Sequence, residues 1–157
     1  METLKHFGVG AGIQHYKQND EEVASDILSA FFPMFLPRKD SNILSRVKIR
    51  AIYKQNKHLM KTKPVGGSWG FFGLHKVPTD SKFIIITEGE YDAMAVWQAT
   101  GHPAVSLPNG ASHLPTQLLP WLENFKRIYL WMDNDLAGQE ASEKFAKKLG
   151  IKRCMIV

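Results

Sequence analysis

The second half of the chain alternates short apolar runs with stretches of helical periodicity. The apolar runs cover residues 83–87, 104–107, 128–132 and 154–157. Helical patterns lie between them, over residues 91–100, 114–123 and 137–149, and a glycine follows the first and the last of these stretches. The order β-α-β-α-β-α-β predicts an α/β domain over residues 81–157, with a parallel sheet flanked by helices.

The first eighty residues carry a different pattern. Asp20 is placed to cap a helix over residues 21–32, in which apolar side chains recur at helical spacing. Residues 47–54 instead alternate apolar with basic side chains, which predicts a strand with one basic face, and residues 58–63 follow as a second strand. A loop rich in glycine and aromatic residues occupies positions 64–73. We therefore expect residues 1–80 to form a small, basic α+β lobe that precedes the α/β domain.

Positive charge is concentrated in one part of the chain. The formal net charge is +5, and eleven Lys or Arg residues with only two acids lie between residues 38 and 82. Such a block favours a polyanionic partner such as nucleic acid, although a solvated, lysine-rich surface would have the same composition. The basic strand face presents Arg46, Lys48 and Arg50, and Lys54 extends the row. This row could follow a phosphate backbone or hold a triphosphate, or it could only discourage pairing at a sheet edge.

Composition excludes several classes of protein. The single cysteine, Cys154, rules out a disulfide framework or a cysteine-rich zinc module within this sequence. The apolar runs are far shorter than a membrane span, so we expect no membrane partner. The first twelve residues lack the basic start and apolar core of a secretory signal. Because a strand pattern reaches the last residue, we expect the sequence to be a piece of a longer protein.

Acidic side chains follow two of the predicted strands. Glu88 comes directly after the strand at residues 83–87, with Glu90 and Asp92 close behind, and Asp133 and Asp135 follow the strand at residues 128–132. The carboxyl ends of parallel strands meet at one edge of a sheet. Clustered carboxylates repel one another unless a cation offsets their charge, and oxygen ligands favour Mg²⁺ or Mn²⁺ over zinc. Glu88 and Glu90 also have a structural interpretation, as favourable charges at a helix N-terminus, and Asp135 could be a helix N-cap.

Three segments resemble the motifs of the Toprim family. Residues 87–93 have the sequence TEGEYDA after a strand, and residues 131–141 have the sequence WMDNDLAGQEA around a D-x-D pair. Between them, residues 106–112, SLPNGAS, are similar to the glycine turn of primase-type Toprim domains, here at Gly110. The likeness extends from about residue 30 to residue 157. It is strongest to the primase-helicase group, which includes phage replicative primase-helicases and Twinkle, the mitochondrial DNA helicase.

The resemblance implies a DNA primase-type nucleotidyltransferase within a primase-helicase. Glu88 would act as general acid/base or metal ligand, and Asp133 and Asp135 would hold Mg²⁺ or Mn²⁺, supported by Glu90 and Asp92. The basic row and the glycine turn would contact a single-stranded DNA template and NTPs. The family also implies the rest of a primase-helicase polypeptide, assembly as a ring-shaped homo-oligomer and a location in the nucleoids of the mitochondrial matrix.

The sequence departs from this family in two ways. It lacks the Cys-rich zinc module that primases of this group use for template recognition, and it lacks the RecA-like helicase domain with its Gly-Lys-Thr phosphate loop. Two other roles therefore stay open. One is a non-catalytic DNA-binding module that supports a replicative 5′-3′ DNA helicase, and the other is a Toprim nuclease with the same metal chemistry. We expect this sequence alone to make little or no primer.

Overall fold

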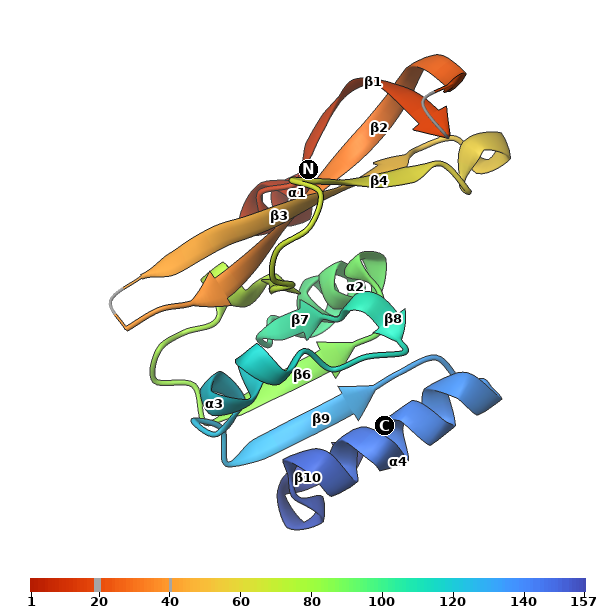
Figure 1. Cartoon of the computed structure of the whole chain (residues 1–157). Helices are drawn as coiled ribbons and strands as arrows, with labels where there is room; N and C mark the ends of the chain where they lie inside the picture. The colour runs from red at the N-terminus through yellow and green to blue at the C-terminus, as the bar shows by residue number, and fades with distance from the viewer. Residues whose placement is uncertain (19–20, 40) are drawn as a thin grey trace.

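The computed structural model describes residues 1–18, 21–39 and 41–157, and nine strands within these ranges form one mixed sheet (Figure 1). Its C-terminal part is parallel. Strand β6 (Phe83–Thr87) pairs with β7 (Ala104–Ser106) on one side and with β9 (Arg127–Trp131) on the other, and β10 (Cys154–Ile156) pairs with β9. The predicted α/β fold with a parallel sheet and flanking helices is confirmed for this part of the chain.

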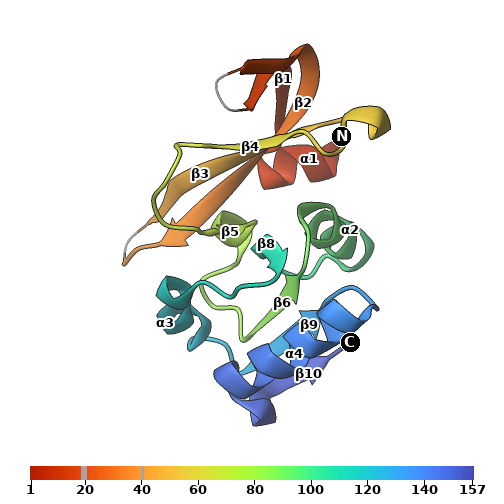
Figure 2. The ribbon, with the colours of Figure 1, turned by 45° about the vertical axis from the view of Figure 1, so that its right-hand side comes forward.

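Helices cover both faces of the parallel strands. Helices α1 (Glu2–Phe7) and α2 (Glu90–Thr100) lie on one face, and α3 (Leu119–Leu122) and α4 (Leu136–Leu149) lie on the other (Figures 1 and 2). The alternation of β6 divides the core accordingly. Ile84 and Ile86 pack in the apolar cluster that contains α4, whereas Ile85 packs in the cluster that contains α1 and α2. No helix in the described part of the chain is long and apolar enough to cross a membrane.

The N-terminal part of the sheet is antiparallel. The long strand β2 (Glu21–Pro37) pairs with β1 (Gly10–Gln18), β3 (Asn42–Ala51) and β5 (Phe71–Phe72), and β4 (Met60–Lys63) pairs with β3. Strand β5 joins the two parts, because Phe72 pairs with Met34 of β2 and with Ser106 of β7. One sheet thus runs through both predicted lobes, and the division near residue 80 stays a prediction.

The helix predicted over residues 21–32 is wrong, because these residues lie in strand β2. Residues 21–28 are mostly exposed, so their apolar spacing does not mark a buried helical face. Burial then alternates residue by residue, with Ala30, Phe32 and Met34 buried in a strand that has partners on both sides. Tertiary pairing overrides the local pattern here. The proposed cap, Asp20, lies outside the described residues.

Several other elements differ from the prediction, and among them β3 covers Asn42–Ala51 instead of residues 47–54. The helix expected over residues 114–123 is reduced to a 3₁₀ turn, Thr116–Leu118, followed by the four-residue helix α3, because Pro115 and Pro120 leave no room for a longer helix. Strands β1, β5 and β8 (Pro108–Ala111) and helix α1 were not predicted at all. The remaining strands and helices of the C-terminal half begin and end within about two residues of their predicted bounds.

Gly70 makes the approach of β5 to β2 possible. A Cβ atom added at this position would lie 2.2 Å from the carbonyl oxygen of Phe35, which is backbone and cannot swing away. We predict that Gly70→Ala lowers the free energy of unfolding by about 1–3 kcal/mol, the usual cost of overpacking a well-packed site. Chemical denaturation monitored by tryptophan fluorescence measures this decrease. Gly10→Ala is the matched control, since its Cβ would lie 3.5 Å from Phe31, an ordinary contact. Equal stability of Gly70→Ala and the parent chain would contradict this account.

Candidate metal and phosphate site

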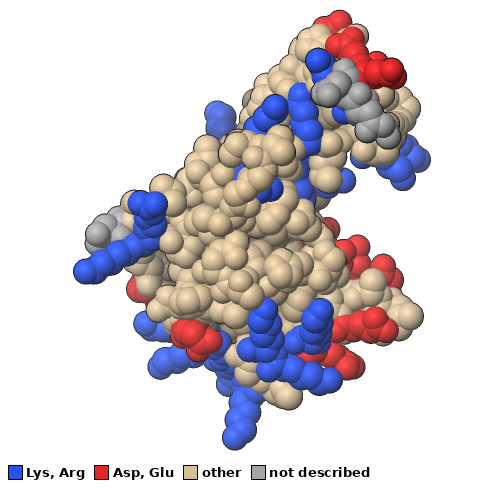
Figure 3. Space-filling view, in the orientation of Figure 1, with Lys and Arg blue, Asp and Glu red and all other residues tan. Residues whose placement is uncertain are grey.

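The two acidic motifs meet at one edge of the sheet. Strands β6 and β9 are parallel neighbours, and Thr87 of β6 pairs with Trp131 of β9. The segments that follow these two residues therefore leave the sheet side by side, and they carry Glu88 and Asp133. Figure 3 shows acidic side chains gathered on the right of the C-terminal half, where Figure 1 places the carboxyl ends of these strands. The two acidic clusters therefore lie at adjacent strand ends, as the sequence predicts.

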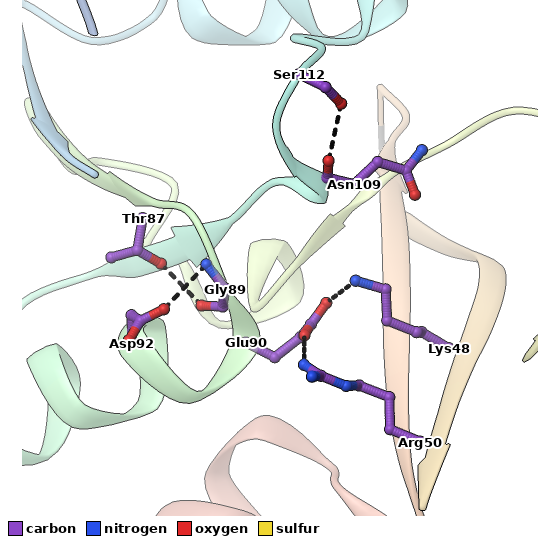
Figure 4. Close-up of polar contacts among 8 residues, drawn as sticks. All are labelled: Lys48, Arg50, Thr87, Gly89, Glu90, Asp92, Asn109 and Ser112. Carbon is purple, nitrogen blue, oxygen red and sulfur yellow. Dashed lines mark hydrogen bonds and ion pairs between the residues drawn. The ribbon is translucent and has the colours of Figure 1, made fainter. Parts of the chain in front are cut away.

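Glu88 carries a buried oxygen atom without a partner. Its Oε2 atom is shielded from solvent and makes no hydrogen bond to any residue that the structure describes. Its Oε1 atom faces Gly110, where an added Cβ would lie only 3.1 Å away and where φ is +62°. The Ser112 hydroxyl closes this turn by donating to the Asn109 carbonyl oxygen over 2.9 Å (Figure 4). Glycine is therefore needed at position 110 both for the backbone conformation and for the room that the Glu88 carboxylate occupies.

Asp92 and Asp133 line a pocket at the same edge. This pocket has a volume of about 710 Å³ and lies between α2 and α4. Asp92 accepts a hydrogen bond from the Gly89 backbone N–H over 3.1 Å, which caps the start of α2. Burial, followed by repulsion from Asp133, raises the pKa of Asp92. A raised carboxyl pKa means that the ionised form is disfavoured here, so a cation at this edge would be stabilising.

Asp135 has a structural task. Its Oδ1 atom accepts a hydrogen bond from the Gly138 backbone N–H over 2.8 Å, so it is the N-cap of α4. Gly138 is needed for the same turn, because a Cβ there would lie 2.1 Å from the Asp133 carbonyl oxygen. The D-x-D pair and the glycine that follows thus form one tight strand-to-helix connection. The structural interpretation of Asp135 as a cap is confirmed, and the cap uses only one of its two carboxylate oxygens.

The carboxylates do not form a closed cage. Within residues 1–18, 21–39 and 41–157, no three His, Cys, Asp or Glu side chains lie together as a metal-binding group. Mg²⁺ is commonly held by one or two carboxylates, with water and substrate phosphates completing its shell, so an open edge suits it. The oxygen donors and the unpartnered Oε2 of Glu88 fit such an ion. The metal ligands Glu88, Asp133, Asp135, Glu90 and Asp92 stay predictions.

At the start of α2, the Glu90 side chain points away from Asp92 and toward Lys48 and Arg50 (Figure 4). Its side chain is 1% exposed and accepts from Lys48 Nζ at 2.5 Å and from Arg50 Nη1 at 3.4 Å. Both cations come from β3, so the predicted basic face of this strand is turned toward the C-terminal half. Sequence spacing carries no sign of this partnership, because 42 residues separate Lys48 from Glu90.

The other members of the basic row are divided between interior and surface. Arg46 is buried, donates from Nη2 to the Gly67 carbonyl oxygen, and lies 4.1 Å from the centroid of the Trp69 ring. These two contacts hold the glycine-rich loop against β3. The cation–π contact between Arg46 and Trp69 was not predicted from the sequence. Lys54 is exposed in a 3₁₀ turn beyond the end of β3. Arg50 and Lys54 are the members of the row that solvent reaches.

Comparisons with known proteins agree with this geometry. Residues 85–157 match the family model described as Toprim-like. The chain is 31% identical over 103 residues to a primase homolog protein of Arabidopsis thaliana, covering 55% of this chain and 30% of that protein. It is 28% identical over 124 residues to the Twinkle homolog protein, chloroplastic/mitochondrial, of the same plant, covering 68% of this chain and 17% of that protein.

A solved structure extends the likeness to nearly the whole chain. The primase fragment of the bacteriophage T7 primase-helicase superposes with a TM-score of 0.71 and 25% sequence identity, covering 99% of this chain and 59% of that fragment. The chain thus spans less than two thirds of each of these proteins. Residues 85–157 form a Toprim-like domain, and together with the residues before it this domain has the fold of a Toprim primase.

Proposed function

We propose that this chain is the Toprim region of a replicative DNA primase-helicase, and that it binds a divalent metal and single-stranded DNA. The observation that carries the proposal is the parallel pairing of β6 with β9, which brings Glu88 and Asp133 to one edge of a sheet that also contains the basic strand β3. The Toprim-like match and the likeness to a phage primase fragment support a primase-type role.

In this proposal the acidic edge holds Mg²⁺ or Mn²⁺. Asp133 is the central ligand, and Asp135 contributes the carboxylate oxygen that does not cap α4. Asp92, in the first turn of α2, adds a negative charge that favours the cation. Glu88 either completes the ligand set or moves the proton of the attacking hydroxyl, since its Oε2 atom has no partner among the described residues. The metal would supply neutralisation of the charge that develops on phosphate during nucleotidyl transfer.

The nucleic acid lies against the exposed part of the basic row. Arg50 and Lys54 contact the phosphates of a single-stranded template or of an incoming NTP. Gly110 lets the backbone of its turn approach the bound nucleotide closely. Template-directed RNA primer synthesis is then the activity of the longer protein, in which this region acts with the rest of a primase-helicase polypeptide assembled as a ring.

The cellular setting belongs to the same proposal. The Arabidopsis relative is named chloroplastic/mitochondrial, which supports an organellar address, and we place this protein in the mitochondrial nucleoid. The second candidate is a non-catalytic module that binds DNA for a replicative helicase. It is favoured by the exposure of Arg50 and Lys54, because these side chains can contact phosphate without a metal.

The metal site is tested by thermal unfolding with and without Mn²⁺. Binding only to the folded chain raises its free energy of unfolding by about 2.7 kcal/mol at a metal concentration of 100 Kd. We predict that Asp133→Asn combined with Asp135→Asn abolishes this gain while the α4 cap survives, because asparagine is also a good N-cap. Glu143→Gln, an exposed carboxylate on α4, is the control that retains the gain. A Mn²⁺-dependent shift of normal size in the double variant would refute the site.

The DNA interaction is tested by its dependence on salt. We predict weak binding of single-stranded DNA whose log K falls linearly with log salt concentration, as counterions are released. Arg50→Gln with Lys54→Gln should lower the slope by about 1–2, because each neutralised phosphate contributes roughly 0.7 to it. Lys147→Gln with Lys148→Gln, at the end of α4, removes the same charge away from β3 and should leave the slope unchanged. A binding constant that does not change with salt concentration would rule out the electrostatic interaction.

Primer synthesis is tested with labelled ribonucleotides on single-stranded DNA in Mn²⁺. We predict little or no product from this chain alone, because alignment of two nucleotides and a template supplies much of the rate of such a reaction. The longer protein should make short RNA products, and Glu88→Gln should remove them. If the longer protein makes none while metal and DNA binding persist, the helicase-supporting role replaces the primase role.

A further inference from the structure

A cluster of three charges, two of them buried, joins the two halves of the chain. The Glu90 carboxylate at the start of α2 contacts Lys48 Nζ at 2.5 Å and Arg50 Nη1 at 3.4 Å (Figure 4). The other ion pairs in the described part of the chain, His15 with Glu22 and Arg153 with Glu123, each lie within one half. The Glu90 cluster is thus the ionic link between β3 and the Toprim-like domain.

The two cations of this cluster have different surroundings. The Lys48 side chain is 8% exposed, so its ammonium group is enclosed with the carboxylate. The Arg50 side chain is 34% exposed, and its guanidinium carbon lies 5.7 Å from the centroid of the Tyr91 ring. A guanidinium group has five N–H donors in a rigid fork. The carboxylate contacts Arg50 through one nitrogen, Nη1, so the other donors of this partly exposed guanidinium group are left for a second anion.

We propose that Glu90 is a positioning residue, which holds the Arg50 guanidinium toward solvent as a phosphate contact for single-stranded DNA. Lys48 offsets the charge of Glu90 and does not touch DNA. Without Lys48, the carboxylate would cancel the charge of Arg50, whereas two cations and one anion leave the cluster with a net positive charge. The inference rests on the proposed function, because it requires Arg50 to contact DNA.

Electrostatics and positioning predict opposite signs for the effect of removing the Glu90 carboxylate. Removing a negative charge beside Arg50 should by itself strengthen the binding of a polyanion. Positioning predicts the reverse, because an Arg50 side chain released from Glu90 gains rotamer freedom that it must give up again when it binds phosphate. The direction of the change in Kd therefore separates the two explanations.

The test measures anisotropy of fluorescein-labelled oligothymidylate with the full 157-residue chain. We expect Glu90→Gln to weaken binding about threefold or more, within the range of coupled pairs. A variant with both Lys48→Met and Glu90→Gln keeps the net charge of the chain and removes the buried pair together, which avoids leaving one buried charge without a partner. It should also bind about threefold more weakly than the parent chain. Adding Glu90→Gln to Arg50→Gln should cause no further weakening, because the Arg50 side chain to be positioned is already gone.

Two controls separate positioning from a general disruption of the fold. In this proposal the Glu90 carboxylate binds Lys48 and Arg50 and not the metal, so each variant should keep its melting-temperature shift with Mn²⁺. Lys48→Gln should lower the melting temperature and leave the salt slope as it is, whereas Arg50→Gln should lower the slope by about 0.7.

The outcomes distinguish this inference from the function on which it rests. Tighter binding by Glu90→Gln, or an equal weakening in the Arg50→Gln background, overturns the positioning role while DNA binding stands. A Kd for Arg50→Gln equal to that of the parent chain overturns it too, because Arg50 would then not contact DNA. If the parent chain binds no oligothymidylate at low salt, the proposed function fails and the inference fails with it.

Discussion

The parallel pairing of β6 with β9 is the constraint on which the candidate site depends. The pairing of Thr87 with Trp131 fixes where both strands end, and the first residues past those ends include Glu88 and Asp133. Burial, followed by repulsion from Asp133, raises the pKa of Asp92, so this edge disfavours negative charge. The fold tolerates this arrangement because the strands beneath it are fully covered, with Ile84, Ile86 and Leu130 completely buried. Such an unfavourable concentration of charge on a stable framework is typical of a site that binds a cation.

The second constraint is electrostatic and comes from the other side of α2. Breaking a buried ion pair by removing one partner typically costs about 3–5 kcal/mol, so the Lys48–Glu90 pair strongly favours one placement of β3 against α2. The continuous sheet acts in the same direction, because Phe72 of β5 pairs with both Met34 and Ser106. The basic strand and the acidic edge are therefore held in a fixed relation, as a site that binds metal and phosphate together requires.

Most of the C-terminal half could be predicted from sequence because nearby residues mark where its strands and helices end. The apolar run at Phe83–Thr87 is followed at once by Glu88, and Gly101 and Gly150 end the helices. Residues 21–32 could not, because the pairing that makes them a strand comes from β1 and β3, and helical spacing carries no information about it. The same limit applies to the site. Spacing placed Glu90 with the acids, whereas its contacts are with Lys48 and Arg50, which only the three-dimensional arrangement brings near.

The central claim is that the carboxyl edge of β6 and β9 holds a divalent metal. Paramagnetic broadening by Mn²⁺ in two-dimensional NMR spectra of the labelled chain tests it most directly, because the effect reports distance from the ion. The account predicts that substoichiometric Mn²⁺ broadens the backbone amide signals of Glu88, Gly110 and Asp133 first, and those of the β1–β2 hairpin last. Uniform broadening, or broadening centred away from Glu88 and Asp133, would contradict it.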